Sequence, residues 1–200
     1  RAGVICPDQP YPLRSNASQI GRCGVELECL TDALRKVILQ QAVIHADETP
    51  VTIMRMDDKD KKPKKGYVWA YATTQYNPIQ AVIYDFQDSR SGEHAEAFLK
   101  DWQGHLVCDD YSGYKARFRS GKVIEVGCMA HARRKFHELH VTGKSQIAEQ
   151  ALFLIEKLYA IEAEIRKNTD GTAEQRYKYR QQHSQPVMRQ LYEWLNQHHP

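Results

Sequence analysis

Two aspartates in this sequence have the chemistry and the context of metal ligands. Asp47 lies inside the β-branched run at 43–54, and Asp109 directly follows the short apolar run at 105–108. If these runs are neighbouring strands, the two carboxylates repel each other unless a cation lies between them. Mg²⁺ prefers such oxygen ligands, and a pair of these ions supports phosphodiester cleavage. The alternative is an ordinary solvated Asp at the end of each strand.

The elements that must position these acids can be inferred from hydrophobic periodicity. Short apolar runs predict five strands, at 43–54, 67–72, 81–86, 105–108 and 123–126. The first three are separated by hairpin-sized connections, which predicts an antiparallel meander. A helix beginning near Ser91 joins the third strand to the fourth, and such a crossover typically delivers a parallel strand. Pro50 has no N–H to donate, so we expect a bulge or a sheet edge there.

The remaining periodic segments predict helices. Helical spacing covers 19–40, and a basic helix follows the fifth strand at 131–140. From Ile147 to Ile165 apolar residues recur at heptad spacing, and a further helix interrupted by Pro186 follows a turn near 168–171. These last two helices predict an αα-hairpin whose inside is the heptad seam. Self-association through the seam is the alternative.

Composition limits the classes of protein to which the chain can belong. A length of 200 residues with 42% hydrophobic and 26% charged residues is typical of a soluble globular chain. No apolar run approaches the roughly 20 residues needed to cross a bilayer. The net charge is only +3, so any surface for nucleic acid must be local. Five cysteines without a C-x-x-C pair favour reduced thiols and a cytoplasmic location. Because Arg1 replaces an initiator Met, we expect a fragment.

Four segments together resemble the insertion-sequence-66 family of bacterial DDE transposases. They are His45-Ala46-Asp47-Glu48-Thr49-Pro50-Val51, Cys108-Asp109-Asp110-Tyr111-Ser112-Gly113-Tyr114, Cys128-Met129-Ala130-His131-Ala132-Arg133-Arg134-Lys135-Phe136, and the helical stretch 151–162. Met129 stands where the family usually has Trp. The resemblance covers about residues 19–200, and four motifs in the right order make it more specific than any single acidic pair.

The resemblance implies an α/β fold, with a ribonuclease-H-like mixed five-stranded sheet, flanking helices and an α-helical hairpin insertion. On that basis we expect an irregular lead at 1–18 and a helix at 19–40 before the core. The partial catalytic core then covers 41–142, and the helical hairpin covers 143–200, with the rest of the core beyond the chain. The implied function is DNA binding with metal-dependent phosphodiester cleavage and strand transfer during DNA transposition.

The resemblance also implies the catalytic residues. Asp47 and Asp109 correspond to the first two acidic ligands of Mg²⁺ or Mn²⁺, and two ions are expected. Because side chains alternate along a strand, the neighbouring Glu48 should point away from the site. Asp110 should point away too, although alternation weakens at a strand end and leaves Asp110 as the alternative ligand. The family's third acid is a Glu in an Asn-Asn-x-x-Glu-Arg motif, which this chain lacks. We therefore expect the fragment alone to be inactive.

Several basic and metal-binding patterns leave more than one interpretation open. Arg133, Arg134 and Lys135 are expected to contact DNA phosphates, against the alternative of a solvated helix face. The lysine-rich run at 59–65 favours a solvated hairpin tip over DNA contact. Cys128 and His131 have the spacing of two zinc ligands, but no second pair lies nearby, so a buried Cys and a His that caps a helix or binds phosphate are favoured.

Two other functions compete with the transposase. One is a catalytically inactive remnant that acts only as a DNA- or protein-binding module. The other is a stand-alone ribonuclease-H-type nuclease, which needs a third acid that the sequence does not offer. The expected partners are DNA, in the form of transposon ends and target, together with other copies of the chain and accessory proteins of the same element. The sequence gives no sign of a membrane partner.

Overall fold

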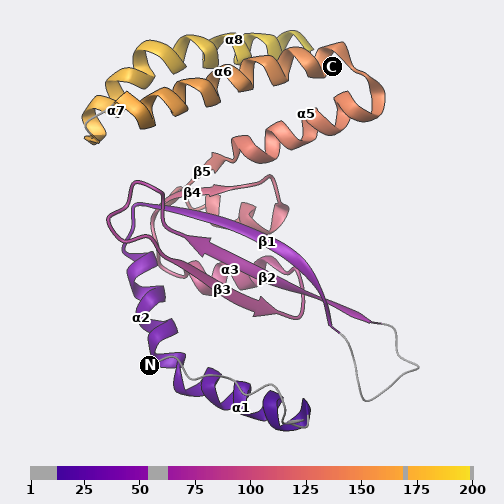
Figure 1. The fold of residues 1–200 in the computed structure, drawn as a ribbon, viewed down its shortest axis with the longest axis vertical. Helices are drawn as coiled ribbons and strands as arrows, with labels where there is room; N and C mark the ends of the chain where they lie inside the picture. The colour runs from indigo at the N-terminus through magenta and orange to yellow at the C-terminus, as the bar shows by residue number, and fades with distance from the viewer. Residues whose placement is uncertain (1–12, 54–62, 169–170, 199–200) are drawn as a thin grey trace, which may run out of the picture. The chain divides into compact units, whose positions relative to one another are not determined.

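The computed structural model describes residues 13–53, 63–168 and 171–198. The chain divides into two compact units, one extending to Val126 and one beginning at Gly127. The first contains the sheet and the second only helices (Figure 1). Each unit is described by itself below.

The first unit is built on a five-stranded mixed sheet. Its strands are β1 (Val43–Ile53), β2 (Lys64–Ala72), β3 (Val82–Gln87), β4 (Gly104–Cys108) and β5 (Val123–Gly127). They lie in the order β3-β2-β1-β4-β5, with β1–β2 and β2–β3 antiparallel and β1–β4 parallel. This arrangement confirms the predicted meander and the predicted parallel fourth strand. The fold is α/β, and its sheet and flanking helices are compatible with a ribonuclease-H-like fold.

The strand β1 pairs differently along its two sides. Its register with β2 runs without a break from His45–Ala72 to Ile53–Lys64, so the predicted bulge at Pro50 is wrong. Its pairing with β4 covers only Val43 to His45. Within the described residues, Pro50 therefore lies where β1 has a partner on one side only, which fits the alternative of a sheet edge. The predicted loop at 57–66 lies mostly outside the described residues, and its last three residues belong to β2.

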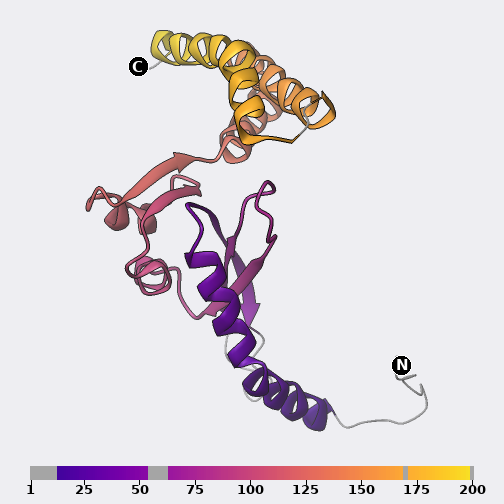
Figure 2. The same ribbon diagram turned by 90° about the vertical axis from the view of Figure 1, so that its left-hand side faces the viewer.

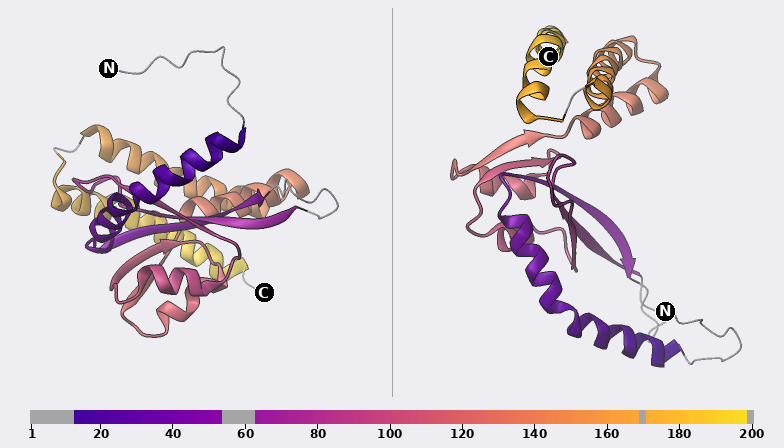
Figure 3. Two further views of the ribbon diagram at one scale, coloured as in Figure 1. Left: turned by 90° about the horizontal axis from the view of Figure 1, so that it is seen from below. Right: turned by 60° about the vertical axis from the view of Figure 1, so that its left-hand side comes forward.

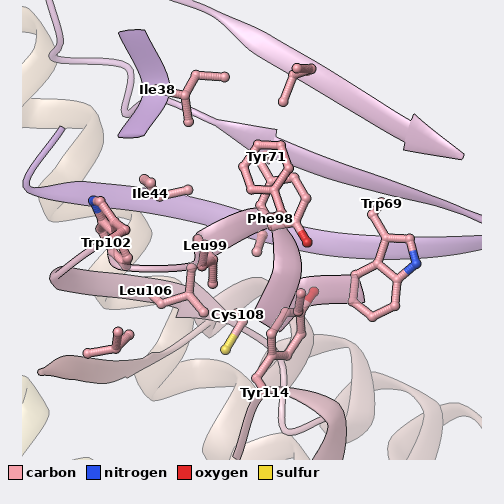
Figure 4. Close-up of a cluster of buried hydrophobic side chains, with 14 residues drawn as sticks. Ile38, Ile44, Trp69, Tyr71, Phe98, Leu99, Trp102, Leu106, Cys108 and Tyr114 are labelled. Atoms are coloured by element: carbon pink, nitrogen blue, oxygen red, sulfur yellow. The ribbon is translucent and has the colours of Figure 1, made fainter. Parts of the chain in front are cut away.

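One face of the sheet carries the main hydrophobic core. The helix α3 (Gly92–Leu99) begins as predicted, with the Ser91 hydroxyl accepting the Glu93 N–H at 3.4 Å. The Phe98 ring of α3 stacks on Tyr71 of β2, with 3.7 Å between centroids and 4° between planes (Figure 4). The buried residues of this core are Ile38, Ile44, Ala46, Trp69, Tyr71, Ile83, Ala95, Phe98, Leu99, Trp102, Leu106, Cys108, Tyr114 and Val123.

Two helices precede the sheet where a single helix was predicted at 19–40. They are α1 (Leu13–Glu26) and α2 (Glu28–Leu39), which meet at Leu27, and α1 begins inside the segment expected to be an irregular lead (Figure 2). Residues 1–12 of that lead lie outside the described residues. Only α2 is anchored in the core, because Ile38 is fully buried and the Arg35 guanidinium donates to the Ala97 carbonyl of α3 at 2.8 Å.

The second unit consists of helices α5 (Met129–Gly143), α6 (Gln146–Asn168), α7 (Ala173–Tyr179) and α8 (Gln185–His198), with a π-helical turn at Arg180–Ser184. The helices α6 and α8 lie side by side, as Figures 1 and 3 show. Ile155, Leu158 and Leu191 form their small buried core. Ile165 is buried as the heptad seam predicts, but Ile147 is 51% exposed. The chain deviates from α-helical geometry before Pro186, which occupies the first turn of α8, where proline is tolerated.

Candidate metal centre

The structure brings Asp47 and Asp109 onto neighbouring strands. His45 of β1 and Val107 of β4 are paired in the parallel ladder, and each aspartate lies two residues beyond its member of that pair. Alternation along β1 therefore directs the Asp47 carboxylate toward the face that carries His45, whereas Asp109 is the first residue after the end of β4. Asp47 is exposed and Asp109 is half-exposed. Asp47 thus lies in β1, and Asp109 directly follows the strand that pairs with β1 in parallel; that the two acids form a joint site stays a prediction.

Local hydrogen bonds hold each of these carboxylates. The Oδ1 of Asp47 accepts the Glu48 N–H at 3.0 Å, and the Oδ1 of Asp109 accepts the Tyr111 N–H at 3.0 Å. The second bond closes an Asx-type turn, in which a side chain caps the backbone two residues ahead. This turn begins at the first residue after β4 and fixes how the chain leaves the sheet.

The neighbour Glu48 faces the opposite side of β1. Its carboxylate is buried and accepts from Arg90 Nε at 2.9 Å, from Arg90 Nη2, and from the Tyr114 hydroxyl at 2.9 Å. Burial raises the pKa of Glu48, and the hydrogen bonds from Arg90 and Tyr114 oppose that rise. The buried Glu48 carboxylate and Arg90 thus form an ion pair, and Glu48 points away from the exposed Asp47, as alternation along β1 predicts.

The neighbour Asp110 is held by a different interaction. Its carboxylate forms an ion pair with the Lys115 ammonium at 2.7 Å, and Lys115 also contacts Glu125 of β5 at 2.6 Å. Hydrogen bonds to Asp110 and Glu125 raise the pKa of Lys115, so this ammonium stays charged. Asp110 is therefore engaged in a surface ion pair, whereas Asp109 caps the turn at the end of β4.

Aromatic residues line the space between Glu48 and the turn that follows Asp109. Trp69 of β2 is fully buried and has its ring centroid 5.8 Å from that of Tyr114 (Figure 4). Its ring centroid lies 6.3 Å from that of Tyr111. The Arg90 guanidinium lies 3.9 Å from the Tyr111 ring centroid. Sequence reasoning did not identify Arg90 or Tyr114 as parts of this region. The Tyr-x-x-Tyr spacing after Asp109 was the available signal for Tyr114, but nothing local marks Arg90.

Within the ranges that the structure describes, no three His, Cys, Asp or Glu side chains lie close enough to hold a metal ion together. The same finding leaves the Cys128–His131 spacing without further zinc ligands. Nor does any helix in the described part of the chain have the length and apolar character needed to cross a membrane.

The basic residues predicted to contact DNA lie in the helical unit. Arg133, Arg134 and Lys135 are exposed on α5. A cavity of about 630 Å³ opens between α5 and α6, and it is lined by Ala130, Arg133, Arg134, His137, Leu152, Glu156 and Tyr159. Two of the three predicted cations therefore line a concave surface, and Lys135 does not.

Comparison with known proteins identifies the family. The model of the transposase IS66 family matches residues 14–200, which is nearly the whole chain. The chain belongs to the IS66 family of transposases. Similar proteins of Sinorhizobium fredii are uncharacterised. One, y4qI, is 32% identical over 188 residues, covering 88% of this chain and 34% of that protein. Another, y4jD, is 37% identical over 175 residues, covering 82% of this chain and 33% of that protein. This IS66-family chain thus spans about a third of the length of these relatives.

Proposed function

We propose that this chain is part of a DDE-type transposase that cleaves DNA phosphodiesters and transfers strands with the help of a divalent cation. The observation that carries the proposal is the parallel pairing of His45 with Val107, two residues before Asp47 and Asp109 on adjacent strands. Membership of the IS66 family supports a transposase, and the paired acids support a metal-dependent one.

The donor chemistry of this site fits Mg²⁺ or Mn²⁺. Asp47 and Asp109 offer carboxylate oxygens, and hard divalent cations take oxygen ligands while keeping several water molecules. Asp47 and Asp109 would hold such ions, and the chemistry supplied there would be activation of a water or a 3′-hydroxyl for attack and neutralisation of charge on the leaving oxygen. The third acidic ligand that the resemblance implies belongs, in this proposal, to a part of the protein outside the chain.

Within the proposal, the residues of this chain have separate tasks. Asp47 and Asp109 hold the cation from adjacent strands, and the Asx turn at Asp109 fixes the direction of its carboxylate. Glu48 and Asp110 take no ligand role, because their carboxylates are engaged with Arg90 and Lys115.

The test compares neighbouring acids in the full-length protein. We expect Asp47→Asn and Asp109→Asn each to reduce strand cleavage by about three orders of magnitude or more, because several kcal/mol of charge stabilisation is lost. Asp110→Asn is the matched control and should retain cleavage, since it removes only a surface ion pair. The measurement is Mg²⁺-dependent cleavage and joining of labelled transposon-end DNA. Full activity of the Asp47→Asn protein, or loss of activity only in Asp110→Asn, would reject the assignment.

We further propose that the cavity between α5 and α6 contacts DNA phosphates through Arg133 and Arg134. Each phosphate contact releases condensed counterions when DNA binds. Removing one contacting arginine should therefore make the dependence of log affinity on log salt concentration less steep, by about 1. The measurement is fluorescence anisotropy with end DNA at several salt concentrations, using Arg133→Ala and Arg134→Ala. Lys157→Ala removes a cation of the same helical unit that does not line the cavity, and its slope should equal that of the unaltered protein.

A further inference from the structure

The carboxylate of Glu48 connects the strand that carries Asp47 to two segments distant in the sequence. It is adjacent to Asp47 in β1, and its partners are Arg90, 42 residues away, and Tyr114, 66 residues away. Arg90 precedes α3, and Tyr114 lies in the turn after β4. The Glu48 carboxylate therefore joins β1 directly to the segment that begins with Asp109. Because it is almost entirely shielded from solvent, with a side chain only 1% exposed, water competes little for these bonds.

Arg90 continues this connection to Asp109. Its guanidinium stacks on the Tyr111 ring at 3.9 Å, and the Tyr111 hydroxyl donates to the Arg90 carbonyl. The Tyr111 backbone N–H in turn donates to the Asp109 carboxylate at 3.0 Å. An unbroken series of contacts thus runs from the residue beside Asp47 to the side chain of Asp109.

Two glycines allow these segments to approach closely. A Cβ on Gly92 would lie 2.5 Å from the Gly113 carbonyl oxygen, and a Cβ on Gly113 would lie 2.2 Å from the Tyr111 ring. The start of α3 and the turn after β4 therefore meet backbone to backbone, where no side chain fits. This approach brings Arg90 within reach of Glu48 and Tyr111 at the same time.

We propose that Glu48, Arg90, Tyr111 and Tyr114 form a positioning network that sets the spacing and direction of the Asp47 and Asp109 carboxylates before a cation binds. The inference rests on the proposed function, because it assumes that the two aspartates hold the metal. None of the four residues touches the cation or the DNA in this account. They act through the backbone of β1 and through the turn that Asp109 caps, and holding ligands in the productive geometry in advance lowers the cost of binding.

The test measures the Mg²⁺ concentration that gives half-maximal DNA cleavage by the full-length protein. Tyr114→Phe removes one hydrogen bond and keeps the ring. Arg90→Lys keeps the charge but loses the planar group that both pairs with Glu48 and stacks on Tyr111. We expect each variant to require about 10-fold more Mg²⁺, in the range found when groups that orient metal ligands are altered. Glu125→Gln is the control, because it removes a nearby charged hydrogen bond outside the network, and its Mg²⁺ requirement should be unchanged.

Thermal unfolding of the same variants separates positioning from stability. If the network only stabilises the fold, Tyr114→Phe and Arg90→Lys lower the melting temperature but the folded protein keeps its Mg²⁺ requirement, and the inference is overturned. The Asp47→Asn variant reports on the proposed function itself. If Asp47→Asn abolishes cleavage while both network variants keep the original Mg²⁺ requirement, the metal site stands and the network does not. If Asp47→Asn leaves cleavage intact, the proposed function itself is rejected, whatever the network variants show.

Discussion

The two faces of the β1–β4 pair differ sharply although their residues alternate one by one. On the core face Ile44, Ala46, Leu106 and Cys108 are buried, and the buried carboxylate of Glu48 on this face accepts three hydrogen bonds from two partners. On the other face the corresponding residues are the exposed His45 and Asp47 and the partly buried Val107. The comparison shows that one face fixes the backbone by packing, while the other presents a carboxylate whose charge the fold does not neutralise by burial.

The largest expected difference in stability between the two faces is seen when adjacent residues of β4 are replaced. Leu106 is fully buried, so Leu106→Ala should lower the free energy of unfolding by about 2–5 kcal/mol, through lost burial and the cavity left behind. Val107 points to the other face and is only partly buried, and Val107→Ala should cost about 1 kcal/mol or less. Urea unfolding of the two variants measures both values. Equal losses would mean that both faces of β4 are packed alike.

A smaller difference is expected between the neighbouring acids of β1. Glu48→Gln weakens the buried hydrogen bonds from Arg90 and should lower the free energy of unfolding by about 1–3 kcal/mol. Each kcal/mol corresponds to a fall of about 2–4 °C in melting temperature. Asp47→Asn keeps an oxygen that can accept the Glu48 N–H and should stay within about 0.5 kcal/mol of the original stability. Differential scanning calorimetry gives both melting temperatures. A larger loss for Asp47→Asn would reverse the roles assigned to the two faces.

The smallest expected effect is the chemical labelling of Cys108, the cysteine on the core face. Burial raises the pKa of Cys108 to about 12. The thiol therefore stays protonated at pH 8, and the thiolate forms only when the pH approaches this pKa. Because the thiolate is the nucleophile, Cys108 should resist alkylation by iodoacetamide while the exposed Cys23 and Cys29 react. Peptide mass spectrometry quantifies the labelling, and unfolding in urea should make Cys108 reactive. Rapid labelling of Cys108 in the folded chain would show that the core face opens.

Much of the sheet could be predicted because its signals are local. β-branched and aromatic runs marked all five strands, and hairpin-sized connections gave the antiparallel order of the first three. The helix start at Ser91 was visible because a serine followed by Glu93 suits an N-terminal cap. The break between α1 and α2 at Leu27 was missed, because Leu27 itself is apolar and neither Gly nor Pro stands there to mark a helix end.

The residues around Glu48 could not be predicted in the same way. Arg90 lies in a connection whose local sequence suggests only a turn before a helix. Its role depends on contacts with Glu48 and Tyr111, which the fold brings together from far apart in the chain. Tyr114 belongs to a motif visible in the sequence, but its partner does not follow from spacing. Long-range pairings of this kind depend on how the strands and α3 pack, which no local pattern encodes.

The sequence by itself determined the two short motifs from which Asp47 and Asp109 are predicted as the metal-binding acids, and it determined the alternation that sends neighbours within a strand to opposite sides. Only the tertiary structure decided which side is buried. The packing of α3 and the turn after β4 against one face of the sheet encloses Glu48 and leaves Asp47 exposed. The physical reason is that alternation fixes only relative directions along a strand, whereas burial depends on the elements that cover each face.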